Sequence, residues 1–101
     1  MATPESKVKV KIKKLLDSYG ERVYRFMPVP SGYGKATIDY LVCFDGLFLG
    51  IEAKAPGEKP TPRQEAVLED IRRAGGSSFV ISNEGELEVL EQFLHTVGKW
   101  G

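Results

Sequence analysis

The sequence predicts an α/β fold, of the α+β mixed-sheet kind, in which helices flank a four-stranded sheet in the order αβββαβα. Two apolar β runs meet at Asp45-Gly46, a dipeptide typical of a two-residue hairpin turn. Two Thr-Pro pairs, at residues 3–4 and 61–62, each open an amphipathic segment. A strand, a helix and a strand follow in succession, a pattern typical of a right-handed crossover between parallel strands. We expect residues 1–101 to form a single domain.

The first predicted helix begins with Thr3 as its N-cap and ends at Gly20. Glu5 falls on the same side of this helix as the apolar residues, so we expect it to point inward. It either complements the helix dipole in the first turn or belongs to a functional site. Lysines occupy the rest of the circumference, and Lys7 and Lys11 are either solvated or in contact with phosphates.

A strand is expected at residues 23–27, followed by a loop rich in Pro and Gly at residues 28–35. The loop runs into the strand that carries Asp39, so it should lie over any site at the start of that strand. Tyr33 and Lys35 in this loop are suited to stacking on a base and binding a phosphate. The alternative is that the loop is a simple connector.

The hairpin places two carboxylates opposite each other. With Asp45 and Gly46 as the turn, counting outward along the two strands pairs Asp39 with Glu52. Lys54 lies two residues beyond Glu52 and therefore on the same face. Like charges that face each other in an apolar run require neutralisation, and a divalent cation with a lysine beside it would supply it. The tripeptide E-x-K alone is frequent on exposed strands and is a weak sign of a functional site. The full set of Asp39, the register-setting turn, Glu52 and Lys54 is a more specific sign of one.

Both faces of the hairpin are apolar, so both should be covered. Alternation places Ile38 on one face together with Tyr40, Val42 and Phe44, and it places Leu41, Cys43 and Phe48 on the other face. Cys43 is expected to be a small core residue. As the chain's one cysteine, it excludes an internal disulfide and a cysteine-rich zinc site.

The second predicted helix begins with a capping box, Thr61-Pro62-Arg63-Gln64. Gln64 either satisfies a backbone N–H as a cap or orients water or phosphate in a site. Gly75-Gly76 ends the helix, and a strand at residues 77–82 follows, which should lie parallel to the strand of Glu52. A final amphipathic helix with an acidic outer face extends over residues 84–97.

The composition is that of an ordinary globular protein with a formal net charge of zero. The charge is nonetheless uneven, with 13 Lys or Arg against 10 Asp or Glu in residues 1–73 and 1 against 4 in the remainder. This division is compatible with one phosphate-facing side. The sequence has neither a signal-peptide pattern at its start nor an apolar run as long as a membrane span, so we expect a cytoplasmic protein.

These residues resemble the PD-(D/E)XK nuclease superfamily, and within it the VRR-NUC group, stand-alone members of which occur in bacteria and phages. Asp39 opening one strand, Glu52-Ala53-Lys54 closing the next and Thr61-x-x-Gln64 opening the following helix carry the resemblance. It implies a restriction-endonuclease-like core. One departure is Ile38, which stands where the family has a proline.

The resemblance also implies roles for these residues. Asp39, Glu52 and the Ala53 carbonyl would bind Mg²⁺ or Mn²⁺, with Glu5 as a further or water-mediated ligand. Lys54 would orient the attacking water and stabilise the developing charge, and Gln64 would support the site.

The expected activity is a metal-dependent DNA endonuclease, selective for four-way (Holliday) junctions or flaps and acting as a homodimer in a bacterial cell or a phage-infected host. Candidate DNA contacts are Tyr33, Lys35, Lys7, Lys11 and Arg63. The alternative is a catalytically inactive nucleic-acid-binding or assembly module with the same fold.

Overall fold

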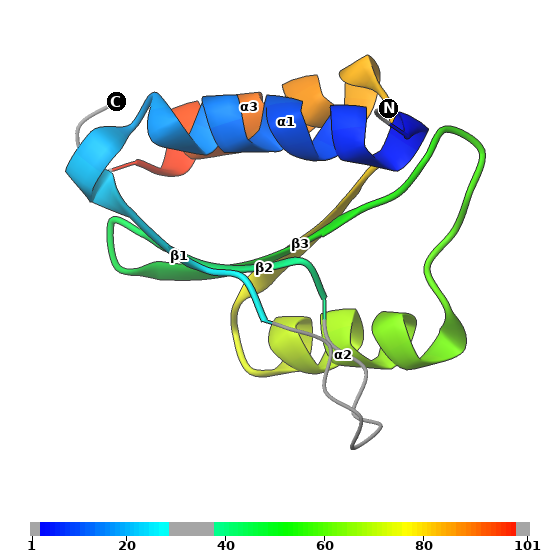
Figure 1. Ribbon diagram of the computed structural model, residues 1–101. Helices are drawn as coiled ribbons and strands as arrows, with labels where there is room; N and C mark the ends of the chain where they lie inside the picture. Colours follow the sequence, from blue (N-terminus) through cyan, green and yellow to red (C-terminus); the bar gives the residue numbers. More distant parts are fainter. Residues whose placement is uncertain (1–2, 29–37, 99–101) are drawn as a thin grey trace.

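The computed structural model describes residues 3–28 and 38–98. Within them the chain forms helix α1 (Pro4–Asp17), a short 3₁₀ segment η1 (Gly20–Arg22), strands β1 (Val23–Phe26), β2 (Tyr40–Phe44) and β3 (Leu47–Ala53), helix α2 (Pro62–Arg73), strand β4 (Ser77–Ile81) and helix α3 (Glu84–Val97) (Figure 1). No helix in these residues is both long enough and apolar enough to cross a membrane.

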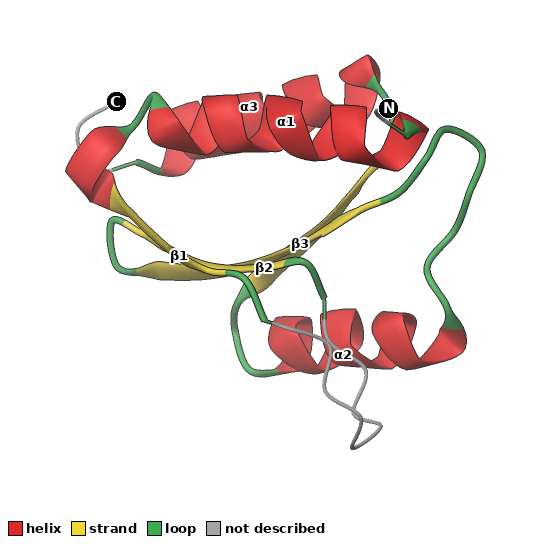
Figure 2. Ribbon diagram, in the orientation of Figure 1, coloured by secondary structure: helices red, strands yellow, loops and turns green. Residues whose placement is uncertain are grey.

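The four strands form one mixed sheet in the spatial order β1-β2-β3-β4. Strand β2 is antiparallel to both of its neighbours, β1 and β3, whereas β4 is parallel to β3. Helices α1 and α3 lie on one face and α2 lies on the other (Figure 2). The predicted mixed sheet with flanking helices, an α+β fold, is therefore confirmed.

The hairpin has the predicted turn and register. Asp45 and Gly46 both have positive φ, 49° and 87°, as a type I′ turn requires. The strand pairs run from Phe44 opposite Leu47 to Tyr40 opposite Ile51. The Asp45 carboxylate accepts a hydrogen bond of 2.7 Å from Arg22 Nη2, and its backbone N–H donates to the Arg22 carbonyl. These bonds attach the turn to the end of η1.

The helix starts are as the sequence predicts. The Thr3 hydroxyl accepts from the Ser6 N–H, and Thr61 forms a capping box with Gln64. Helix α1 ends at Asp17, before the predicted stop at Gly20, because Ser18 closes the last turn onto the carbonyls of the preceding residues. Gly20, with φ of 59°, then begins η1.

Two apolar clusters cover the two faces of the sheet. The first packs β-strand residues, among them Tyr40, Val42 and Phe44, against α1 and α3. The second joins Ile38 to Leu68 and Ile71 of α2. The prediction that Ile38 shares a face with Tyr40 is therefore wrong: β2 begins only at Tyr40, with a bend at Asp39 before it, so the strand alternation does not extend to Ile38.

Both faces are covered by helices, as expected, but the cover of the α2 face is partial, and the expectation that Cys43 is a core residue is wrong. Cys43 is exposed rather than in the core, and Phe48 is 48% exposed. Helix α2 packs mainly against β4 and β3. The outer part of the same face, over β1 and the end of β2, therefore lies beyond its cover.

Candidate functional site

Asp39 and Glu52 meet where the β2–β3 ladder ends. The strand register stops at the Tyr40–Ile51 pair, one step short of them. The Asp39 N–H donates to Glu52 Oε1 at 3.0 Å, and the Ala53 N–H donates to Asp39 Oδ2 at 2.8 Å. Each carboxylate thus accepts a hydrogen bond from the backbone of the other chain segment. This reciprocal pairing fixes both side chains at one end of the sheet.

Lys54 is the cation beside Glu52. Its Nζ lies 3.3 Å from Glu52 Oε2, and the two side chains are only 14% and 3% exposed. Burial raises the pKa of the Glu52 carboxyl above its ordinary value, and the charge of Asp39 raises it further. The hydrogen bond from the Asp39 N–H and the Lys54 ammonium oppose this rise without cancelling it.

Lys9 is a second cation in the cluster, and the sequence reasoning missed it. Its Nζ lies 3.5 Å from Asp39 Oδ1 and 3.4 Å from Glu5 Oε2. Burial lowers the pKa of Lys9, but the charges of Asp39 and Glu5 outweigh this effect and raise it. The spacing of four residues between Glu5 and Lys9 puts both on one side of α1, and this signal could have identified the pair.

Glu5 does not point into the core as expected. Its side chain is 42% exposed and contacts the site through the Lys9 ammonium. The cluster therefore holds three carboxylates, Glu5, Asp39 and Glu52, and two ammonium groups, Lys9 and Lys54. The like charges that the sequence places together are largely balanced by lysines from two different elements.

The donor set fits a divalent cation of the Mg²⁺ or Mn²⁺ type. Within residues 3–28 and 38–98, no three His, Cys, Asp or Glu side chains gather closely enough to hold a metal ion by themselves. Mg²⁺, however, is commonly held by one or two carboxylates, with water and substrate phosphates completing the shell. Asp39 and Glu52 are two such oxygen donors, and each keeps one oxygen that faces an ammonium rather than a backbone N–H.

The other expected ligands are less directly placed. Ala53 is fully buried with its N–H bonded to Asp39, and a ligand role for its carbonyl stays a prediction. Gln64 takes the first of its two considered roles: its Oε1 accepts from the Thr61 N–H at 3.0 Å while its own N–H donates to Thr61 Oγ1. A direct part in the site is not needed to explain this residue.

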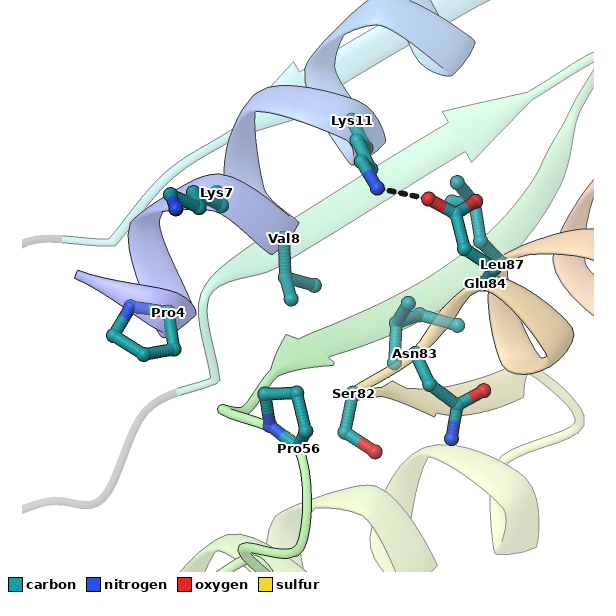
Figure 3. A pocket seen from close by; sticks show the side chains of 10 residues that line it. Pro4, Lys7, Val8, Lys11, Pro56, Ser82, Asn83, Glu84 and Leu87 are labelled. Carbon is teal, nitrogen blue, oxygen red and sulfur yellow. Dashed lines mark hydrogen bonds and ion pairs between the residues drawn. The ribbon is translucent and has the colours of Figure 1, made fainter. Parts of the chain in front are cut away.

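The predicted DNA-contacting lysines of α1 lie away from the carboxylates. Lys7 and Lys11 are each two residues, about 200° of helical rotation, from Lys9. They line a hollow of about 350 Å³ between the start of α1, the loop after β3 and the start of α3, and Lys11 forms an ion pair with Glu84 there (Figure 3). Arg63 is exposed in the first turn of α2, and Tyr33 and Lys35 lie outside the described residues.

Comparison with known proteins identifies no family for the chain. No family model matches the sequence, and no curated protein is similar to it. The resemblance to PD-(D/E)XK nucleases therefore depends on the quoted motif residues, chiefly Asp39, Glu52 and Lys54.

Proposed function

We propose that the protein is a Mg²⁺- or Mn²⁺-dependent DNA endonuclease of the PD-(D/E)XK type, related to the VRR-NUC group. One observation carries the proposal: Asp39 and Glu52 are cross-bonded at the end of the hairpin with Lys54 3.3 Å from Glu52. Burying the Glu52 carboxylate beside the partly buried carboxylate of Asp39 costs stability, and such clusters are characteristic of sites where charge is used for chemistry.

The roles of the residues follow from their positions. A bound divalent cation would be held by Asp39 and Glu52, and it supplies Lewis acidity that lowers the pKa of water and neutralises a phosphate oxygen. The Ala53 N–H holds Asp39 in orientation, and the Asp39 N–H does the same for Glu52. Lys54 presents a fixed positive charge where negative charge develops during phosphodiester hydrolysis. Lys9, at the outer side of Asp39, adds positive potential along the path of an approaching phosphate.

The substrate we propose is branched DNA, a flap or a four-way junction. A chain of 101 residues offers little surface for reading a base sequence, whereas contacts to the phosphate backbone can recognise the geometry of the DNA without reading its bases. The resemblance of the motif residues to those of junction-resolving nucleases is our reason to propose a homodimer that makes paired cuts.

The second candidate is a non-catalytic nucleic-acid-binding or assembly module. The observation that favours it is the neutralisation of the carboxylates by Lys9 and Lys54, which balances most of the charge without a metal ion. Thermal unfolding with and without Mn²⁺ distinguishes the two. A metal ion that binds the native state raises Tm, whereas a purely lysine-neutralised site gives no shift.

The proposal is tested by cleavage of labelled single strands, duplexes, 5′ flaps, 3′ flaps and four-way junctions in Mg²⁺, Mn²⁺ or EDTA. Lys54→Ala is compared with Lys59→Ala, which removes an exposed lysine of the following loop. We expect metal-dependent cutting of a branched substrate by the wild type and by Lys59→Ala, and loss of cutting in Lys54→Ala. Binding without cutting of any substrate would favour the assembly module.

A further inference from the structure

The hollow beside α1 lies at the same end of the sheet as the carboxylate cluster. Strand β2 begins just after Asp39, β3 ends just before Lys54, and the parallel strand β4 ends at Ile81, so these three ends meet there. The Lys54 N–H donates to the Ile81 carbonyl at 2.9 Å, and Ile81 lines the hollow. Because neighbouring strands are roughly 5 Å apart, the hollow on the β4 side follows directly after Lys54 along this end of the sheet.

Helix α1 borders both the hollow and the carboxylate cluster. Pro4 and Val8 line the hollow, whereas Glu5 and Lys9 belong to the cluster. Each pair is four residues apart, and the second pair is displaced from the first by one residue, about 100° of helical rotation. The hollow and the cluster are therefore neighbours on two flanks of the same helix. A nucleotide next to one whose phosphate lies at the cluster is within reach of the hollow.

The hollow has apolar walls and a polar rim. Its volume of about 350 Å³ is at the small end of ligand pockets, which span roughly 300–1,000 Å³. Lys7 at the rim is exposed and forms no ion pair within the described part of the chain. The Asn83 side chain accepts from the Glu86 N–H at 2.8 Å through Oδ1, which leaves its NH₂ group as a donor. The apolar wall residues are Pro4, Val8, Pro56, Ile81 and Leu87 (Figure 3).

We propose that the hollow holds the unpaired base of a nucleotide next to the scissile phosphate, with Lys7 on a phosphate of that nucleotide. This inference rests on the proposed nuclease function. Apolar walls suit the faces of a base, and the Asn83 NH₂ can donate to its edge. The Lys7 ammonium complements a phosphate. An inorganic anion alone would not use the apolar walls, and Glu84 and Glu86 already place negative charge at the start of α3.

This ligand connects the hollow with branched DNA. A base inside a duplex must leave its stack and its partner before it can enter a pocket, and this costs free energy. An unpaired base at a flap or a branch point has already lost part of these interactions. The hollow would therefore favour branched over duplex DNA through one unpaired base rather than through a base sequence.

The test measures binding in EDTA, without metal and without cleavage. Deoxythymidine 3′,5′-bisphosphate is titrated while the methyl NMR signals of Val8, Ile81 and Leu87 are followed. Deoxyribose 3′,5′-bisphosphate, which lacks the base, and inorganic phosphate are titrated in parallel. We expect these methyl signals to shift with the nucleotide alone, and removal of the base to weaken binding about tenfold.

Two pairs of variants place the ligand. Val8→Phe fills the hollow, and Val67→Phe is its matched control, because Val67 is also a partly buried helical valine and lines a separate hollow of about 290 Å³ beside α2. Lys7→Ala removes the rim cation, and Lys14→Ala removes another exposed lysine of α1. Val8→Phe and Lys7→Ala should weaken nucleotide binding, whereas both controls should bind as the wild type does.

Equal binding of the two bisphosphates, or methyl signals of the hollow that do not respond to the nucleotide, would overturn the inference. Wild-type nucleotide binding by both Val8→Phe and Lys7→Ala would also overturn it. Cleavage of branched DNA by a protein whose hollow does not respond would refute this inference and leave the nuclease in place. Conversely, a hollow that binds the nucleotide in a protein that cuts no DNA would support the base pocket and refute the nuclease.

Discussion

Replacing Lys9 by Met should tighten the binding of a divalent cation. The Lys9 ammonium lies 3.5 Å from Asp39 Oδ1, the oxygen not bonded to the Ala53 N–H. A dication on that carboxylate would be roughly 5 Å from the ammonium, and even in the dielectric of water the repulsion is about 1.7 kcal/mol. Removing this repulsion should lower the dissociation constant of the cation by more than roughly tenfold.

The assay is calorimetric titration of Mn²⁺ into the wild type and Lys9→Met. Lys13→Met is the matched control, because Lys13 is also in α1 but pairs with Asp17, 2.8 Å away. The control should bind Mn²⁺ as the wild type does. Equal or weaker binding by Lys9→Met would refute the competition between lysine and metal, and absence of binding by all three proteins would refute the metal site itself.

Two further predictions concern stability. Glu52→Gln should raise Tm in EDTA at pH 8. The pKa of Glu52 is raised in the folded protein, so the fold is more stable when this carboxyl is protonated and loses that stability as pH rises, whereas glutamine stays neutral. The gain in Tm should shrink below the ordinary pKa of 4.5, and a lower Tm of the variant at both pH values would contradict the prediction. Gly50→Ala should lower the free energy of unfolding in urea by about 1–3 kcal/mol. The added Cβ would lie 2.5 Å from the Cδ1 atoms of Ile38 and Ile71. Ile71→Val removes one of these two atoms and should restore part of the lost stability. An unchanged free energy of unfolding in Gly50→Ala would show that the packing here is loose.

The parts of the fold set by local rules were predictable from the sequence. The Asp45-Gly46 turn determines the hairpin register, because each strand alternates with a period of two and a two-residue turn leaves no freedom to slip. The capping box at Thr61 was predictable because both of its bonds form between residues three apart. The meeting of Asp39 and Glu52 follows from that register and is found in the structure.

The parts that depend on packing between distant elements were not predictable. The contact of Lys9 with Asp39 requires the position of α1 over the end of the sheet, which no local pattern specifies. The exposure of Cys43 depends on how far α2 extends across its face. Ile38 was misplaced because a strand pattern was continued through the bend at Asp39, where the chain enters the site.

The central claim is that Asp39 and Glu52 together hold the metal ion that DNA cleavage requires. Its most direct test measures Mn²⁺ binding and branched-DNA cleavage in parallel for the wild type, Asp39→Asn and Glu52→Gln. We predict that both variants stay folded, judged by circular dichroism, and lose Mn²⁺ binding and cleavage together. A folded variant that cleaves at the wild-type rate would contradict the claim.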